Sequence, residues 1–168
     1  MEMKNIRQAT IDDLSRITEI LVFNYRLNFY PIFQNDDFYF CELQVPKLME
    51  DYRDLISNMW VYDDGVVKGF IQVENGEIKK LFVEPVLQGN SIGSKLLNFA
   101  IKECNAVSIW IDVSNIESIV LCKSACTLQL ITFAELHRFA LYARSCINFK
   151  VNLNHRRFCL RKYDAVDI

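Results

Sequence analysis

Glycine and proline are scarce in this sequence, and both are missing from residue 94 onward. The 168 residues include five glycines and three prolines, and none of them lies after Gly93. Because these residue types form many tight turns and end many helices, the stretch 94–168 contains few signals for a reversal of the chain. After Ser145 its only obvious turn formers are Asn148, Asn152 and Asn154.

A strong net charge, long hydrophobic runs and a leader sequence are also lacking. The formal net charge is −2, which gives no general attraction to nucleic acid. No apolar run approaches the ~20 residues that a membrane-spanning helix needs. The N-terminal stretch 1–13 is polar and acidic, unlike a secretory signal. We therefore expect a cytoplasmic protein without a membrane partner, folded as one domain over 1–168.

The spacings of cysteine and histidine do not match a metal site. Cys122 and Cys126 have no matching second pair, and His137 and His155 lie far apart in the sequence. A structural zinc site needs four ligands of this kind at suitable spacings. We therefore expect no metal, and we interpret the six cysteines as free thiols that are mostly buried.

The hydrophobic pattern alternates between strand and helix periods along the chain. Two hairpin signals, Asp63-Asp64-Gly65 and Asn75-Gly76, separate three consecutive strand candidates. The predicted order, β–α–α–β–β–β–α–β–α, indicates an α/β fold with a mixed, mostly antiparallel sheet and helices on both faces. The expected elements are a strand at 5–11, helices at 10–25 and 46–58, strands at 59–62, 66–74 and 77–83, a helix at 92–103, a strand at 107–113 and a short helix from Asn115.

The stretch 28–40, between the first two predicted helices, is rich in aromatic residues. Pro31 and Asn35-Asp36-Asp37 are expected to break it into turns. Such a segment either packs over the core or lines a substrate pocket, and the sequence favours neither. Its aromatic residues are Phe29, Tyr30, Phe33, Phe38, Tyr39 and Phe40.

The stretch Glu77–Ala100 carries the clearest functional signal, a strand followed by a polar, glycine-bearing turn and a helix. A helix that begins directly after such a turn leaves several backbone N–H groups without partners, and its dipole favours an anion there. The turn therefore predicts a phosphate site. The alternative is a strand–turn–helix unit that binds nothing, which many α/β proteins contain.

The residues of this stretch resemble the signature of the GCN5-related N-acetyltransferase (GNAT) superfamily. The strand ends in Leu81-Phe82-Val83-Glu84-Pro85, and the turn reads Gln88-Gly89-Asn90-Ser91-Ile92-Gly93. The resemblance covers about residues 4–120 and includes the order of the elements. One departure is Ser91, which stands where the first glycine of the motif belongs; a positive φ there would strain a residue with a Cβ.

The resemblance implies acetyl-CoA as the acetyl donor and an amine of a small molecule or a protein as the acceptor. The backbone of the strand before the turn would bind the acetyl and pantetheine groups, and this strand would splay from the strand at 107–113. An excess of acids over bases in residues 1–122 mildly favours a cationic acceptor. The implied cofactor-binding residues are Leu81, Phe82 and Val83 in the strand, Gln88, Gly89, Asn90, Ser91, Ile92, Gly93 and Ser94 in the turn, and Asn115.

Two catalytic residues follow from the same resemblance. Glu77 matches in spacing the glutamate that some members use as a general base, although a surface carboxylate beside Lys79 explains it equally well. Cys122 occupies the position of the tyrosine that protonates the leaving thiolate, and a thiol is a weaker donor than a phenol.

From residue 121 onward the sequence departs from the family pattern. One hypothesis is a diverged hairpin at 146–153 and 157–163, and another is that the segment 121–168 is read in a shifted frame. The departures leave two alternatives to an active enzyme. One is a catalytically weak acyl-CoA-binding or regulatory domain on the same fold. The other is an interaction module that binds an anion or nucleic acid through its basic tail, which includes Arg156, Arg157, Arg161 and Lys162.

Overall fold

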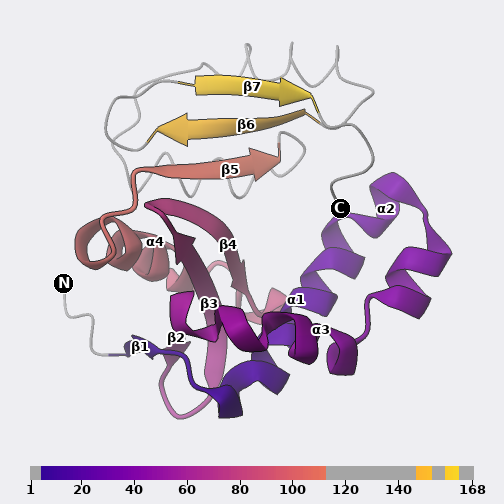
Figure 1. Ribbon diagram of the computed structural model, residues 1–168, viewed down its shortest axis with the longest axis horizontal. Helices are drawn as coiled ribbons and strands as arrows, with labels where there is room; N and C mark the ends of the chain where they lie inside the picture. The colour runs from indigo at the N-terminus through magenta and orange to yellow at the C-terminus, as the bar shows by residue number, and fades with distance from the viewer. Residues whose placement is uncertain (1–4, 113–146, 153–157, 163–168) are drawn as a thin grey trace.

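The computed structural model describes residues 5–112, 147–152 and 158–162. These residues form one mixed sheet with helices on both faces, which confirms the predicted α/β fold (Figure 1). Neighbouring strands are antiparallel except for β4 and β5, which are parallel. In spatial order, which is also the chain order, the strands are β1 (Ile6–Gln8), β2 (Met59–Asp63), β3 (Val67–Glu74), β4 (Glu77–Val83), β5 (Ser108–Asp112), β6 (Ile147–Asn152) and β7 (Phe158–Lys162).

The helices lie mainly before β2 and between β4 and β5. The longer ones are α1 (Leu14–Asn28), α3 (Val45–Tyr52) and α4 (Ile92–Glu103), and α2 (Tyr30–Phe33) is a single turn. Three 3₁₀ turns lie between these elements, at Ile11–Asp13 before α1, at Arg53–Asn58 after α3 and at Pro85–Leu87 after β4, and a π-helical turn spans Asp37–Glu42. The parallel pair β4 and β5 is joined by α4, as a crossover connection requires.

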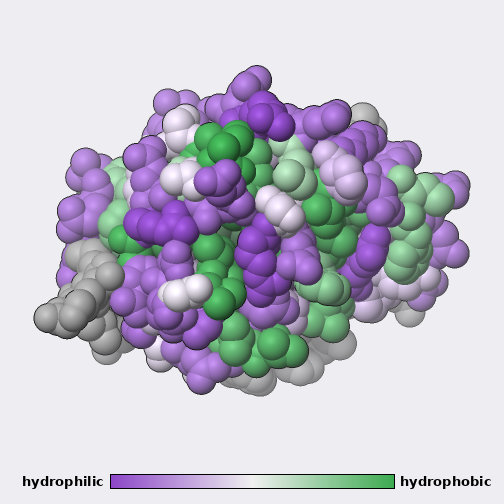
Figure 2. Space-filling view, turned by 90° about the horizontal axis from the view of Figure 1, so that it is seen from below, coloured by the Kyte–Doolittle hydropathy of each residue, from purple (hydrophilic) through white to green (hydrophobic). Residues whose placement is uncertain are grey.

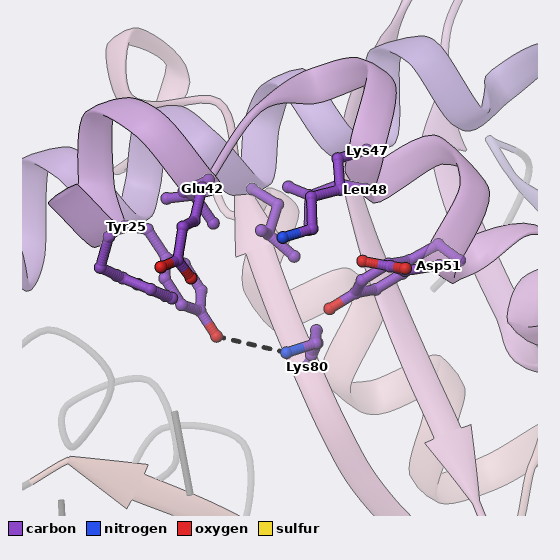
Figure 3. A pocket seen from close by; sticks show the side chains of 10 residues that line it. Tyr25, Glu42, Lys47, Leu48, Asp51 and Lys80 are labelled. Atoms are coloured by element: carbon purple, nitrogen blue, oxygen red, sulfur yellow. Dashed lines mark hydrogen bonds between the residues drawn. The ribbon is translucent and has the colours of Figure 1, made fainter. Parts of the chain in front are cut away.

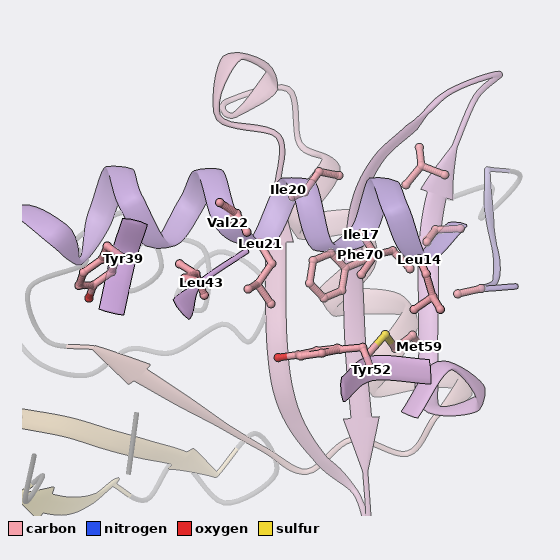
Figure 4. Close-up of a cluster of buried hydrophobic side chains, with 13 residues drawn as sticks. Leu14, Ile17, Ile20, Leu21, Val22, Tyr39, Leu43, Tyr52, Met59 and Phe70 are labelled. Atoms are coloured by element: carbon pink, nitrogen blue, oxygen red, sulfur yellow. The ribbon is translucent and has the colours of Figure 1, made fainter. Parts of the chain in front are cut away.

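The alternation of side chains in the strands divides the core into two layers. In β2, Met59 and Val61 pack against α1 and α3, whereas Trp60 and Tyr62 face α4. Figure 4 shows the first layer, in which the apolar side chains of α1 lie over Phe70 and Met59 of the sheet. The helices therefore fix β3 and β4 from both faces.

An ion-pair network joins the start of α1 to the edge of the sheet. The Arg7 guanidinium donates to both carboxylate oxygens of Asp13 at 2.8 Å and to Asp63 at 2.8 and 3.0 Å. The same Asp13 accepts from the backbone N–H and the hydroxyl of Thr10, which caps the helical turn. The Arg7 hydrogen bonds hold the pKa of the Asp13 carboxyl down at about 2.

Several predicted boundaries agree with the structure, and others differ for local reasons. The strand at 77–83 and the helix at 92–103 have the expected limits, and an antiparallel hairpin of β6 and β7 confirms the predicted one. The predicted helix 46–58 tightens into a 3₁₀ turn at Arg53, and the predicted strand 5–11 is limited to Ile6–Gln8. The aromatic stretch contains helical turns rather than turns alone. Its Tyr39 is buried in the core, as one of the two alternatives predicted, and its Phe38 lines a cavity.

The surface carries no described segment that suits a membrane interior. Of the helices in the described ranges, none is both long enough and apolar enough to cross a bilayer. Figure 2 shows hydrophobic residues in separate groups among hydrophilic ones on the face seen from below. Such scattered exposure is ordinary for a folded protein.

Candidate active site

The parallel strands β4 and β5 meet at one end and separate toward the other. Their pairing consists of Glu77 with Ser108 and Ile78 with Ile109. Beyond these residues β4 continues to Val83 without pairing to β5, whereas β5 remains paired with β6. An opening therefore separates the two strands along the second half of β4, as the resemblance predicted for this strand pair.

A β-bulge lies at the start of this opening. In the register of β3 and β4, Gln72 faces Lys80 and Val73 faces Ile78, so Lys79 is an extra residue on β4. A bulge increases the local twist of a strand and redirects the side chains around it. It helps to turn β4 away from β5, and it was not predicted because no glycine marks it.

The amide groups of β4 alternate between β3 and the opening. The backbone N–H of Glu84 donates to the Lys68 carbonyl of the β3 side at 2.9 Å, so residues an even number of positions away also face β3. The backbone N–H of Phe82 is therefore directed at β3, whereas the N–H groups of Leu81 and Val83 are directed at the opening. Of the three predicted strand residues, these two have polar backbone groups available to a ligand.

Two side chains hold the C-terminal end of β4 in place. The carbonyl of Val83 accepts hydrogen bonds from Nδ2 of Asn24 at 3.0 Å and from Nε2 of Gln88 at 3.4 Å. The buried Asn24 also accepts from Gln88 at 3.2 Å, which ties the turn to α1. Glu84 forms an ion pair with Arg16 of α1 at 2.7 Å. Asn24 was not predicted, although a polar residue seven positions after Ile17, on the apolar stripe of α1, was a signal for it.

The turn after β4 exposes a row of backbone donors at the start of α4. In the described part of the chain, the N–H groups from Gly89 to Ser94 donate to no protein acceptor, and the first helical bond is from Lys95 to Ser91. This arrangement fits an anion such as a pyrophosphate. The Lys95 ammonium instead lies over the ring of Tyr62, 5.1 Å from its centroid, and contributes no contact to the turn.

Ser91 adopts the left-handed conformation that the glycine of the motif would favour. Its φ is 59° and its ψ is 13°, and its side chain makes no capping hydrogen bond. The left-handed region costs an L-residue roughly 1–2 kcal/mol. The structure therefore shows strain at the one position where the motif departs from the family pattern.

Glu77 lies at the closed end of the opening, where β4 and β5 are still paired. Its carboxylate forms an ion pair with Lys79 at 2.7 Å, and its side chain is largely shielded from solvent. It is four residues, or about 13 Å of strand, before Leu81. The ion pair is the arrangement expected of a structural carboxylate. The other predicted contacts, Asn115 and Cys122, lie outside the described residues.

A cavity of about 210 Å³ lies on the face of the sheet that α1 and α3 cover (Figure 3). Lys80 of β4 points into it, between Tyr25 of α1 and the buried Tyr52 of α3. The exposed side chains are Glu42, Lys47 and Asp51, and the remaining lining residues are Leu21, Phe38, Leu43 and Leu48.

Among the described residues, tyrosines rather than a carboxylate surround the ammonium of Lys80. It donates to the Tyr25 hydroxyl at 3.2 Å and lies 5.6 Å from the centroid of that ring and 5.7 Å from the centroid of the Tyr52 ring. Burial lowers the pKa of Lys80, but the two phenols raise it by more, so the side chain stays protonated. Burial raises the pKa of Tyr52, which therefore remains a neutral phenol at physiological pH.

No metal centre accompanies these features in the described ranges. They contain no group of three or more His, Cys, Asp or Glu side chains that could hold an ion.

Comparisons with known proteins agree with this geometry. Residues 40–118 match the acetyltransferase (GNAT) domain family. This range includes β4, the start of the opening, the turn and α4. A search of curated proteins found no match.

Several solved structures share the fold. The apo form of YjaB from Escherichia coli has a TM-score of 0.52 and 17% identity, over 71% of this chain and 79% of its own. A GNAT-family acetyltransferase from Bacillus cereus has a TM-score of 0.50 and 17% identity, over 72% of this chain and 80% of its own. A GCN5-related N-acetyltransferase from Rhodopseudomonas palustris has a TM-score of 0.54 and 17% identity, over 74% of this chain and 82% of its own. The fold is thus the one that these acetyltransferase structures share, and residues 40–118 match the GNAT domain, as the sequence motif indicated.

Proposed function

Because residues 40–118 match the GNAT domain and the chain has the GNAT fold, we propose that this protein transfers an acetyl group from acetyl-CoA to an amine. The observation that carries the proposal is the opening between β4 and β5, which leaves the Leu81 and Val83 N–H groups without a partner among the described residues. The donors from Gly89 to Ser94 continue from the same strand. The acceptor is an amine of a small molecule or a protein amino group, and the reaction takes place in the cytoplasm.

The described residues fit the parts of acetyl-CoA in sequence along β4 and the turn. The backbone of Leu81 and Val83 would bind an extended pantetheine arm in the manner of an added strand. The N–H groups of Gly89–Ser94, together with the dipole of α4, would hold the pyrophosphate. Gln88 contributes through its side chain, which fixes the turn to the Val83 carbonyl. Asn115 is proposed as a further contact.

The reaction requires a neutral amine, a donor to the developing oxyanion and a proton for the leaving thiolate. The N–H of Val83 is the proposed oxyanion donor, because it faces the opening while that of Phe82 faces β3. Glu77 is the proposed base; six residues, or about 20 Å of strand, separate it from Val83, so it would act through a chain of water molecules. Cys122 is the proposed acid.

A catalytically weak acyl-CoA-binding domain is the second candidate. It is favoured by the strained Ser91 and by the ion pair that Glu77 makes with Lys79, both of which reduce what the site offers to catalysis. The two candidates share the cofactor site and differ in turnover.

Binding and turnover measured together separate the two candidates. Excess acetyl-CoA should raise the melting temperature, since a ligand at 100 times its Kd stabilises a fold by about 2.7 kcal/mol. Release of the coenzyme A thiol in the presence of amines should follow if the protein is an enzyme. A melting shift without thiol release across a broad panel of amines favours the binding domain, and no shift at all rejects both.

A pair of substitutions at Val83 tests the oxyanion donor. Val83→Pro removes an N–H that faces the opening, where proline is tolerated because no ladder bond is lost. We expect kcat to fall by about 10²–10³-fold. Val83→Ala keeps the N–H and loses more of the side chain, so it is the control for packing. Equal loss of kcat in both variants would remove Val83 from this role.

A further inference from the structure

The half-buried Lys80 is the feature of the cavity that the fold alone does not explain. In the described part of the chain no Asp or Glu lies within ion-pair distance of its ammonium, whereas Lys68 and Lys79 each pair with a carboxylate. A charge removed from water without a counter-ion is costly. Residues that break such a rule are found mainly at functional sites.

The Lys80 ammonium and the Tyr25 hydroxyl both have hydrogen-bond donors without an acceptor among the described residues. Its ammonium carries three N–H donors and no acceptor, and the hydrogen bond to Tyr25 uses one of them. Because the Tyr25 oxygen accepts that bond, its own O–H is free to donate elsewhere. A ligand group that only accepts, and that carries a negative charge, satisfies both side chains. A carboxylate has these properties.

The cavity is suited to a small amphiphilic molecule. Its volume of about 210 Å³ is below the roughly 300–1,000 Å³ of pockets for drug-sized ligands. Leu21 and Leu48 supply apolar walls, while Glu42 and Asp51 are exposed and can attract a cationic amino group toward the cavity. A small molecule that carries a carboxylate for Lys80 and an amino group on the adjacent carbon suits this lining.

The position of Lys80 on β4 connects the cavity to the proposed reaction. Lys80 immediately precedes Leu81, and consecutive Cα atoms are about 3.8 Å apart, so a ligand held at Lys80 lies beside the strand that would carry the thioester. A positive charge close to an amine also favours the neutral form of that amine. The reaction needs this form as its nucleophile.

We propose that Lys80, with Tyr25 and Tyr52, forms a carboxylate-binding subsite and that the acceptor is an amino acid. This inference rests on the proposed acetyl transfer and narrows its acceptor. It replaces the cationic amine that the overall acidity of residues 1–122 mildly favoured, because the charge nearest β4 in the cavity is positive while the acids lie on exposed positions.

Paired substrates test the subsite directly. Each of the twenty standard amino acids is compared with its primary amide by release of the coenzyme A thiol. We expect kcat/KM for the preferred amino acid to exceed that of its amide by about 10–100-fold, the range for a hydrogen bond to a charged group. In Lys80→Met this preference should disappear, mainly through KM. Lys102→Met, which removes an exposed charge on α4, is the matched control and should keep it.

A binding measurement keeps the inference testable if turnover is slow. N-acetylated amino acids and their amides, as product mimics, are compared by melting temperature with wild type and with Lys80→Met and Lys80→Gln. A larger shift for acids than for amides in wild type, absent from both variants, supports the subsite. Equal shifts for acids and amides, or a preference that survives in both variants, overturn it. Failure of acetyl-CoA to shift the melting temperature counts instead against the proposed function.

Discussion

Replacing Ser91 with glycine should stabilise the protein, because Ser91 has a left-handed backbone. Its φ of 59° costs roughly 1–2 kcal/mol for a residue with a Cβ. The substitution removes no helix cap, because the Ser91 side chain makes no capping hydrogen bond. Glycine also increases the entropy of the unfolded chain, which offsets about 0.4–1 kcal/mol of the gain.

These two ranges leave a net gain in the free energy of unfolding of about 0–1.6 kcal/mol, with a central value of about 0.8 kcal/mol. For a domain of this size, 1 kcal/mol corresponds to roughly 2–4 °C in melting temperature, so we expect a rise of about 1–4 °C. Thermal unfolding followed by circular dichroism measures the shift.

A companion substitution separates the Cβ from the hydroxyl. Ser91→Ala keeps the Cβ and its strain but removes the oxygen, so its melting temperature should stay close to that of wild type. If Ser91→Gly instead lowers the melting temperature, or if Ser91→Ala raises it as much as Ser91→Gly does, the backbone strain assigned to Ser91 is refuted.

Three further predictions concern stability around the site. Gly69→Ala should cost about 1–3 kcal/mol and weaken acetyl-CoA binding, since its Cβ would lie 2.9 Å from the Phe82 carbonyl oxygen; unchanged urea unfolding would contradict it. The Asp13 carboxyl has a pKa of about 2 in the folded protein, against 3.8 normally, so it stabilises the fold above pH ~4 and this stabilisation is lost as the pH falls toward 2. Over that interval the free energy of unfolding of the wild type should fall by about 1–2 kcal/mol more than that of Asp13→Asn. Parallel pH profiles of the two proteins would contradict this. Gln72→Met should raise the melting temperature by roughly 2–4 °C, because the Gln72 Oε1 is buried without a partner in the described part of the chain; a lower value would show that this oxygen is hydrogen-bonded.

The fold could be predicted where each residue choice supported a single element. The hairpin turns and the strand at 77–83 carried both turn chemistry and strand periodicity, and the structure has them at the expected places. The limits at 5–11 and 46–58 were wrong because apolar spacing alone does not distinguish an α-helical from a 3₁₀ turn, nor a paired strand from the extended residues after it.

The candidate site was only partly predictable for a different reason. The turn Gln88–Gly93 is a continuous sequence feature, so its donors could be anticipated. The cavity around Lys80 combines residues from α1, α3 and β4 that are distant in the sequence, and no local pattern joins them. The bulge at Lys79 likewise depends on the register with β3, which side-chain alternation within β4 does not reveal.

Amide hydrogen exchange with and without acetyl-CoA tests the central claim most directly, because it reads individual backbone N–H groups. The account predicts that acetyl-CoA slows exchange at Leu81, at Val83 and from Gly89 to Ser94, while Phe82 is already protected by β3. Unchanged exchange at Leu81, Val83 and the turn under saturating acetyl-CoA would contradict it.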